Sequence, residues 1–142
     1  MANPDPEIVR KVTQWLGFAD EDLKLASHTM DLLVEDTPYR LIAYHAQQCA
    51  EKCLKAFLVY HKVDFPYTHS IGRLLRLCGD LAAWPQTLKD AKELTPYAVT
   101  ARYPGEDEEV TKAEALRAVE LAQQVRTVVR SDLQKLGLQI PQ

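Results

Sequence analysis

The sequence predicts an all-α protein, an up-and-down antiparallel helical bundle of four to five helices in a single domain. Apolar residues recur at three- and four-residue steps in every long segment, and no apolar pattern is typical of a strand. The connections between these segments are short, which favours antiparallel packing of neighbours. A chain of 142 residues is about one domain's length. We therefore predict one domain over residues 1–142, with a core from about 6 to 136.

The first two predicted helices occupy residues 6–34 and 38–63. Pro4 and Asp5 suit a helix start, and the sequence 64–67 (Asp-Phe-Pro-Tyr) ends the second helix because proline cannot continue it. The apolar stripe of the first helix consists of Val12, Trp15, Leu16, Ala19, Leu23, Ala26 and Met30.

Three further helices follow. A short one is predicted over residues 70–81, and another over 85–100, where Pro96 predicts a kink or an early end near Glu93 or Leu94. The last helix begins at a predicted capping box formed by Thr111 and Glu114.

Composition limits the possible functions. Hydrophobic residues make up 46% and charged residues 26% of the chain, as in ordinary globular proteins. The formal net charge of −3 argues against indiscriminate binding of nucleic acid, which depends on phosphate neutralisation. The N-terminus lacks a signal-peptide pattern, and no apolar run is long enough to span a membrane. We expect a cytoplasmic protein.

The second helix carries a polar stripe. At about 100° per residue, four of its side chains fall within an arc of about 80°, with Glu51 at the edge. These four are His45, Gln48, Lys52 and Lys55. One interpretation is a solvated helix face. The other is a groove lined by a central helix, where the lysines hold a phosphate and the histidine exchanges a proton near neutral pH.

Two loop motifs have either a structural role or a role in binding a ligand. Arg102 and Tyr103 precede Pro104, and they either form a helix-ending turn or bind an anion and stack on a base. His69 follows Thr68 and precedes Ser70. It either closes a loop beside a helix N-cap or contributes to the same site.

The cysteines favour a core role. Cys49 and Cys53 follow His45 at four-residue steps, but both turn towards the apolar side of the helix, and no paired short motif typical of zinc is present. Three cysteines in helical, apolar contexts are typical of reduced thiols. We expect them to be reduced and buried, and we expect no metal and no cofactor.

Taken together, several segments resemble the HEPN family of small helical prokaryotic domains. The matching segments are Trp15-Leu16, 19–23 (Ala-Asp-Glu-Asp-Leu), 45–58 (HAQQCAEKCLKAFL), Thr68-His69-Ser70 with Leu74-Leu75, 94–97 (Leu-Thr-Pro-Tyr) and 101–104 (Ala-Arg-Tyr-Pro). The resemblance implies a helical bundle that commonly dimerises and is often encoded with a minimal nucleotidyltransferase in a toxin–antitoxin-type system. Nucleotide binding and RNA cleavage both occur among relatives.

The ribonuclease branch of that family carries Arg-x(4–6)-His near the start of a late helix. No histidine follows Arg102 at that spacing. The one formal match is Arg40 with His45, whose side chains would point about 140° apart on a continuous helix. That makes them a poor shared site within one chain, although they could still meet across a dimer.

Three hypotheses follow. The first is a non-catalytic dimeric module that binds a nucleotide or a nucleotidyltransferase partner. Its predicted ligand-binding residues are His45, Gln48, Lys52, Lys55, Arg102 and Tyr103, with Glu51 and His69 as further candidates. The second is a metal-independent ribonuclease toxin, with His45 as acid–base group and Arg40 or Arg102 stabilising the phosphate. The third is a structural subunit whose polar stripe lies in a homodimer interface.

Overall fold

The computed structural model describes residues 3–32, 35–99 and 109–140. This part of the chain contains four α-helices, one 3₁₀-helix and no strand, which confirms the predicted all-α class. The elements are α1 (Pro6–Asp31), α2 (Tyr39–Tyr60), α3 (Ile71–Gly79), η1 (Gln86–Ala98) and α4 (Lys112–Lys135).

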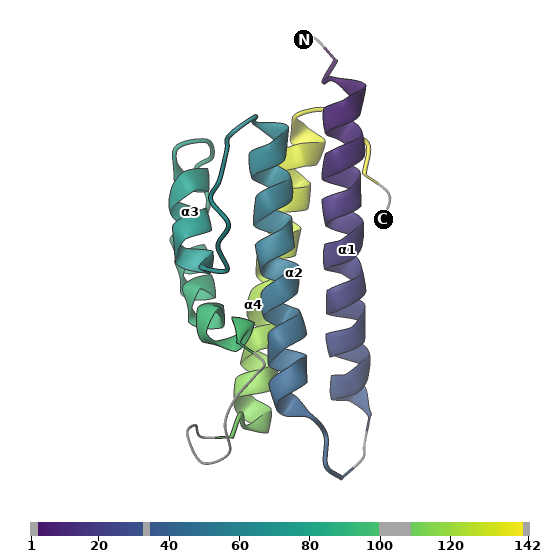
Figure 1. The fold of residues 1–142 in the computed structure, drawn as a ribbon, viewed down its shortest axis with the longest axis vertical. Helices are drawn as coiled ribbons and strands as arrows, with labels where there is room; N and C mark the ends of the chain where they lie inside the picture. Colours follow the sequence, from purple (N-terminus) through teal and green to yellow (C-terminus); the bar gives the residue numbers. More distant parts are fainter. Residues whose placement is uncertain (1–2, 33–34, 100–108, 141–142) are drawn as a thin grey trace.

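Helix α2 lies at the centre of the molecule. The long helices α1, α2 and α4 run side by side, while α3 and η1 form a shorter layer on the other side of α2 (Figure 1). Each of the other four elements packs against α2. Its apolar side chains are accordingly among the most buried in the protein, and they include Phe57, Ile42, Leu54 and Leu58. A polar side chain on α2 therefore meets protein on most sides.

Side chains cap the starts of α3 and α4. The hydroxyl of Thr111 accepts a hydrogen bond from the backbone N–H of Glu114 at 3.1 Å, and the Glu114 carboxylate accepts one from the backbone N–H of Thr111 at 3.1 Å. This is the predicted capping box. Ser70 caps α3 by accepting from the backbone N–H of Arg73 at 3.2 Å. Both caps satisfy backbone donors that a helix leaves without partners.

Several helices are shorter than predicted. Helix α2 ends at Tyr60 rather than residue 63, because Lys62 adopts a left-handed conformation with φ of 58°. Helix α1 ends at Asp31, where Leu32 is already extended, and the predicted end at Val34 lies outside the described residues. Helix α3 ends two residues before the predicted boundary, at Gly79.

The prediction for residues 85–100 was wrong in helix type and in its early end. The segment forms a 3₁₀-helix that continues past Leu94 and through Pro96 to Ala98. Its buried residues Leu88, Ala91 and Leu94 are spaced three apart. A helix with three residues per turn aligns that spacing on one face, so the burial of these side chains supports the tighter winding.

The three cysteines are free and buried, as predicted. A hydrogen bond with Cys53, together with burial, raises the pKa of the Cys49 thiol well above its ordinary value. Burial raises the pKa of Cys78 to about 12. The thiols of Cys49 and Cys78 are therefore protonated core groups and poor nucleophiles at neutral pH. None of the helices in the described part of the chain combines the length and apolarity needed to cross a membrane.

The capping box gives a first prediction. Replacing Thr111 by Ala removes one cap of α4, and we expect the free energy of unfolding to fall by about 1 kcal/mol. Urea denaturation measures this loss. The matched control is Thr13→Ala on the exposed side of α1, which should change stability by less than about 0.5 kcal/mol. Equal effects of the two variants would contradict a capping role for Thr111.

Candidate functional site

The first polar cluster joins α1 to α2 and is called the Asp22 cluster. Nδ1 of His45 lies 2.8 Å from Oδ1 of Asp22, and Nζ of Lys52 lies 2.6 Å from Oδ2 of the same carboxylate. Asp22 is buried on α1, whereas His45 and Lys52 keep about a quarter of their side chains exposed. One carboxylate thus holds two of the predicted site residues.

The chemistry of the Asp22 cluster follows from its donors and acceptors. An ionised carboxylate only accepts hydrogen bonds, so Nδ1 of His45 carries the proton and Nε2 is the acceptor nitrogen of the neutral ring. The charges of Asp22 and Lys52 offset one another. The cluster is therefore neutral while the imidazole is neutral.

The second polar cluster lies deeper, around Glu51, and is called the Glu51 cluster. Its carboxylate accepts hydrogen bonds from Nζ of Lys55 at 3.0 Å and from Nε2 of Gln47 at 3.1 Å. Nδ1 of His69 lies 2.8 Å from the same carboxylate. The side chains of Glu51 and Lys55 are only 5% and 7% exposed. Gln47 also donates to the backbone carbonyl of His69 at 3.0 Å, which fixes the loop before α3.

Aromatic rings complete the surroundings of Lys55. Its ammonium lies 5.8 Å from the ring centre of Trp15 and 5.7 Å from that of Phe65. A cation in this position is attracted to the face of an aromatic ring. Lys55 therefore connects α1 and the segment after α2 to the central helix.

The pKa of Glu51 reflects two opposing effects. Burial raises it, since a charged carboxylate is poorly solvated inside the protein. The hydrogen bonds from Lys55, Gln47 and His69 favour the charged form and together outweigh burial, so the pKa lies below its ordinary value. Glu51 is therefore ionised at neutral pH.

The structure corrects the predicted polar stripe. Lys55 does not lie on an exposed face with His45 and Lys52, because it is buried against Glu51. On the helical wheel Lys55 is the stripe residue nearest to Glu51, which explains why it turns towards the core. Lys52 and Lys55 bind separate carboxylates, and among the described residues they share no acceptor.

The other predicted site residues do not join the Asp22 cluster. Gln48 donates to the side-chain oxygen of Gln47 at 2.7 Å and so belongs to the Glu51 cluster. Arg102 and Tyr103 lie outside the described residues. Arg40 stands at the start of α2, where it lines a hollow of about 510 Å³ with Tyr39 and Tyr97.

Within one chain, Arg40 and His45, the possible ribonuclease pair, point in different directions. Helix α2 is continuous from Arg40 to His45, so their side chains point about 140° apart. His45 is held by Asp22, whereas Arg40 lines the hollow at the start of the helix. A single protomer does not bring the two together on one face of α2.

The sequence pattern did not single out the carboxylate partners on α1. Asp22 falls in the apolar stripe between Ala19 and Ala26, and a carboxylate at such a position is a signal for a buried partner. Asp20 accepts from Arg126 at 2.7 Å and from Arg130 at 3.3 Å, which links α1 to α4.

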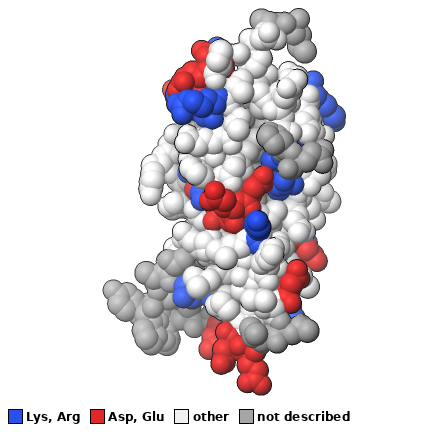
Figure 2. All heavy atoms as spheres, turned by 90° about the vertical axis from the view of Figure 1, so that its right-hand side faces the viewer, with Lys and Arg blue, Asp and Glu red and all other residues white. Residues whose placement is uncertain are grey.

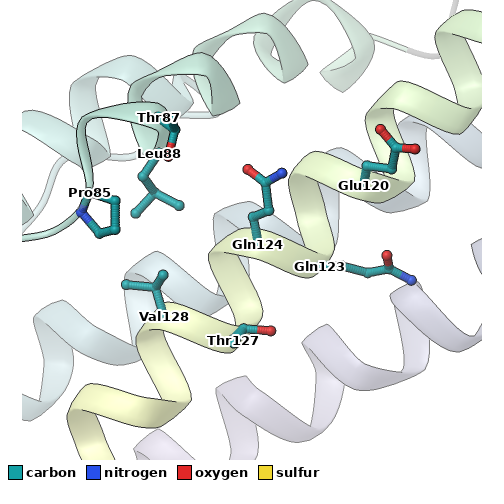
Figure 3. A pocket seen from close by; sticks show the side chains of 8 residues that line it. All are labelled: Pro85, Thr87, Leu88, Glu120, Gln123, Gln124, Thr127 and Val128. Carbon is teal, nitrogen blue, oxygen red and sulfur yellow. The ribbon is translucent and has the colours of Figure 1, made fainter.

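Shallow hollows lie elsewhere on the surface. One of them lies between the start of η1 and helix α4 and has a volume of about 440 Å³. Figure 3 shows Leu88 and Gln124 on its opposite walls. Its lining is apolar or uncharged apart from Glu120. Among the described residues, no three His, Cys, Asp or Glu side chains gather as they would around a metal ion.

Apolar side chains flank the Asp22 cluster on the surface. Phe18 and Leu25 on α1 are 47% and 52% exposed, and Leu41 on α2 is 38% exposed. On the helical wheel, Phe18 and Leu25 lie on the same side of α1 as Asp22, and Leu41 lies on the same side of α2 as His45. We call this surface the α1–α2 face: Phe18, Asp22, Leu25, Leu41, His45, Gln48 and Lys52. Figure 2, which views the molecule from the side of α1, shows acidic and basic residues beside one another near mid-height, with further charged residues towards both ends of this face.

Comparisons with known proteins agree with this architecture. The family model described as the HEPN domain matches residues 12–132. The chain is similar to TT1696 from Thermus thermophilus, with 28% identity, a TM-score of 0.73 and a match covering 87% of this chain and 98% of that chain. It also shares its fold with ST0689, an archaeal HEPN homologue, at 24% identity and a TM-score of 0.67, covering 86% of this chain and 97% of that chain. Among curated proteins the sequence finds no significant match.

The Glu51–Lys55 pair predicts a large mutational effect. Lys55→Met keeps most of the packing but leaves a buried carboxylate without its ammonium partner, a change that costs roughly 3–5 kcal/mol. Two hydrogen bonds to Glu51 remain, so we expect the lower end of that range in urea denaturation. Lys24→Met, at an exposed lysine of α1, is the matched control. A loss below about 1 kcal/mol for Lys55→Met would show that the pair contributes little to stability.

The pKa of Glu51 predicts how stability depends on pH. Because the folded-state pKa lies below the unfolded-state value of about 4.3, its contribution is fully present above that pH and is lost as the pH falls through the folded-state pKa. Glu51→Gln cannot titrate, so we expect a less stable protein at neutral pH with a shallower loss of stability below about pH 4.3. Urea denaturation at a series of pH values measures both slopes. If stability fell with pH equally steeply in the unmodified protein and in Glu51→Gln, the lowered pKa of Glu51 would not contribute to the pH dependence.

Proposed function

The chain belongs to the HEPN domain family, and from that premise we propose that it is a non-catalytic binding module. In this proposal it forms a homodimer through the α1–α2 face and serves as the partner of a minimal nucleotidyltransferase in a two-component system of toxin–antitoxin type. The observation that carries the proposal is the arrangement of three exposed apolar side chains around the Asp22 cluster, in which one carboxylate contacts both His45 and Lys52.

The α1–α2 face has the properties of a protein interface. Phe18, Leu25 and Leu41 expose large apolar surfaces that a monomer leaves in water. The charged groups between them already satisfy one another, so a partner can cover them without leaving a charge unpaired. Interfaces that persist in solution commonly combine an apolar contact with few uncompensated charges.

The same geometry favours protein binding over nucleotide binding at this face. A phosphate that approached Lys52 would compete with the Asp22 carboxylate, which is 2.6 Å away. Lys55 is enclosed and paired with Glu51. An anion at either lysine would gain an attraction only by weakening an ion pair that the fold already makes.

Catalysis at the two histidines has less support. His45 and His69 each donate to a carboxylate, but neither lines any of the hollows of 440, 510 and 670 Å³ on the described surface. A general acid or base must lie within hydrogen-bonding reach of a bound substrate. The ribonuclease hypothesis therefore requires a second protomer to complete the site.

The interface predicts the effect of charged substitutions. We expect the double variant Phe18→Glu with Leu25→Glu to be monomeric at tens of micromolar, where the unmodified protein is a dimer, because four carboxylates would face one another across a symmetric contact. Sedimentation velocity measures the change. Leu116→Glu, at an equally exposed leucine of α4, is the matched control and should remain dimeric.

A monomeric unmodified protein, or a double variant that still dimerises, would refute the proposed interface. Thermal unfolding of each variant separates loss of the dimer from loss of the fold. The partner is tested separately, by co-expression with a minimal nucleotidyltransferase encoded beside this gene. Failure of the two tagged proteins to co-purify, or absence of such a gene, would refute that part of the proposal.

A further inference from the structure

One buried side-chain nitrogen in the described part of the chain has no hydrogen-bond partner, and it is Nε2 of His61. His61 directly follows the last residue of α2. The centre of its ring lies 4.5 Å from that of Phe57 and 5.1 Å from that of Tyr60. Buried polar atoms in folded proteins are almost always hydrogen-bonded. Neither polar cluster includes His61, so the α1–α2 face does not account for this exception.

The surroundings of His61 come from three parts of the chain. Phe57 and Tyr60 on α2 supply aromatic rings. The indole of Trp84, which lies just before η1, has its centre 4.7 Å from that of the Phe57 ring. Among the described residues, Asp132 on α4 is the charged group that acts on the imidazole, and its carboxylate accepts a hydrogen bond from Nε1 of Trp84. The imidazole, the indole and the carboxylate therefore form a connected set near the ends of α2 and α4.

A proton on His61 is unfavourable in this position. Burial lowers the pKa of His61 and outweighs the carboxylate of Asp132, which favours the charged form. An imidazolium donates from both nitrogens, and Nε2 has no acceptor in the folded protein. The carboxylate that can relieve this lack is that of Asp132, which already holds the indole of Trp84.

We propose that His61 is a proton-sensitive switch that releases Trp84 from Asp132 when the pH falls below neutrality. The neutral imidazole packs against Phe57 and leaves the indole bonded to α4. The imidazolium competes for the carboxylate, because a charged donor forms a stronger hydrogen bond than a neutral indole. Trp84 precedes Pro85, which lines the hollow between η1 and α4, so release of the indole changes the shape of that hollow. None of these residues belongs to the α1–α2 face, so this proposal and the proposed function can fail independently.

The test uses the full chain with Trp15→Phe, which leaves Trp84 as the only tryptophan. NMR follows the indole N–H resonance of Trp84 as the pH is lowered from 8 to 5. We expect this resonance to shift together with the titration of His61, below the ordinary histidine pKa of about 6.5. Trp84 fluorescence should move to longer wavelength as the indole becomes more exposed. On the same background, His61→Gln should lose both changes, whereas His28→Gln, at an exposed histidine of α1, should keep them.

Several outcomes would overturn the proposal. A Trp84 resonance that does not shift over this pH range is one, and a response that persists in His61→Gln or is lost in His28→Gln is another. Circular dichroism checks that each variant is folded. If His61→Gln does not fold, the imidazole resonance of His61 in the Trp15→Phe protein gives the answer. Titration of His61 at or above about pH 6.5, or at a pH different from the shift of the Trp84 resonance, would refute the switch.

Discussion

The buried contact between Glu51 and Lys55 is the constraint on which much of the architecture depends. Helix α2 packs against the other four elements, so a charge on its buried side must be paired inside the protein. Glu51 meets this requirement on α2 through Lys55 and beyond α2 through His69. The bond to His69 holds the chain immediately before α3 begins. The position of the α3–η1 layer is therefore coupled to the charge state of one carboxylate.

Two carboxylates of helix α1, Asp20 and Asp22, form ion pairs with different helices. Asp22 binds His45 and Lys52 on α2, whereas Asp20 binds Arg126 and Arg130 on α4. Asp20 and Arg126 are each about a third exposed, so their pair contributes little net free energy, whereas Arg130 is buried. Their effect is on alignment, since a shift of α1 by one residue would separate both carboxylates from their partners.

Periodicity in the sequence was sufficient for the helical fold, because burial along a helix repeats every three or four residues whatever lies opposite. The capping box at Thr111 is equally local. The site was less predictable, because a helical wheel gives the direction of Lys55 within α2 but not the carboxylate, rings and loop that enclose it. The winding of η1 required attention to the three-residue spacing of Leu88, Ala91 and Leu94, a weaker signal than Pro96. Asp22 was recognisable only as a carboxylate in an apolar stripe.

The pairing of Lys52 with Asp22 limits what could bind at the α1–α2 face. At the α1–α2 face, an incoming phosphate would have to replace Asp22 at Lys52 and would leave that buried carboxylate without a cation, a change that costs free energy. A protein surface faces no such penalty, because it can cover the cluster and leave it intact.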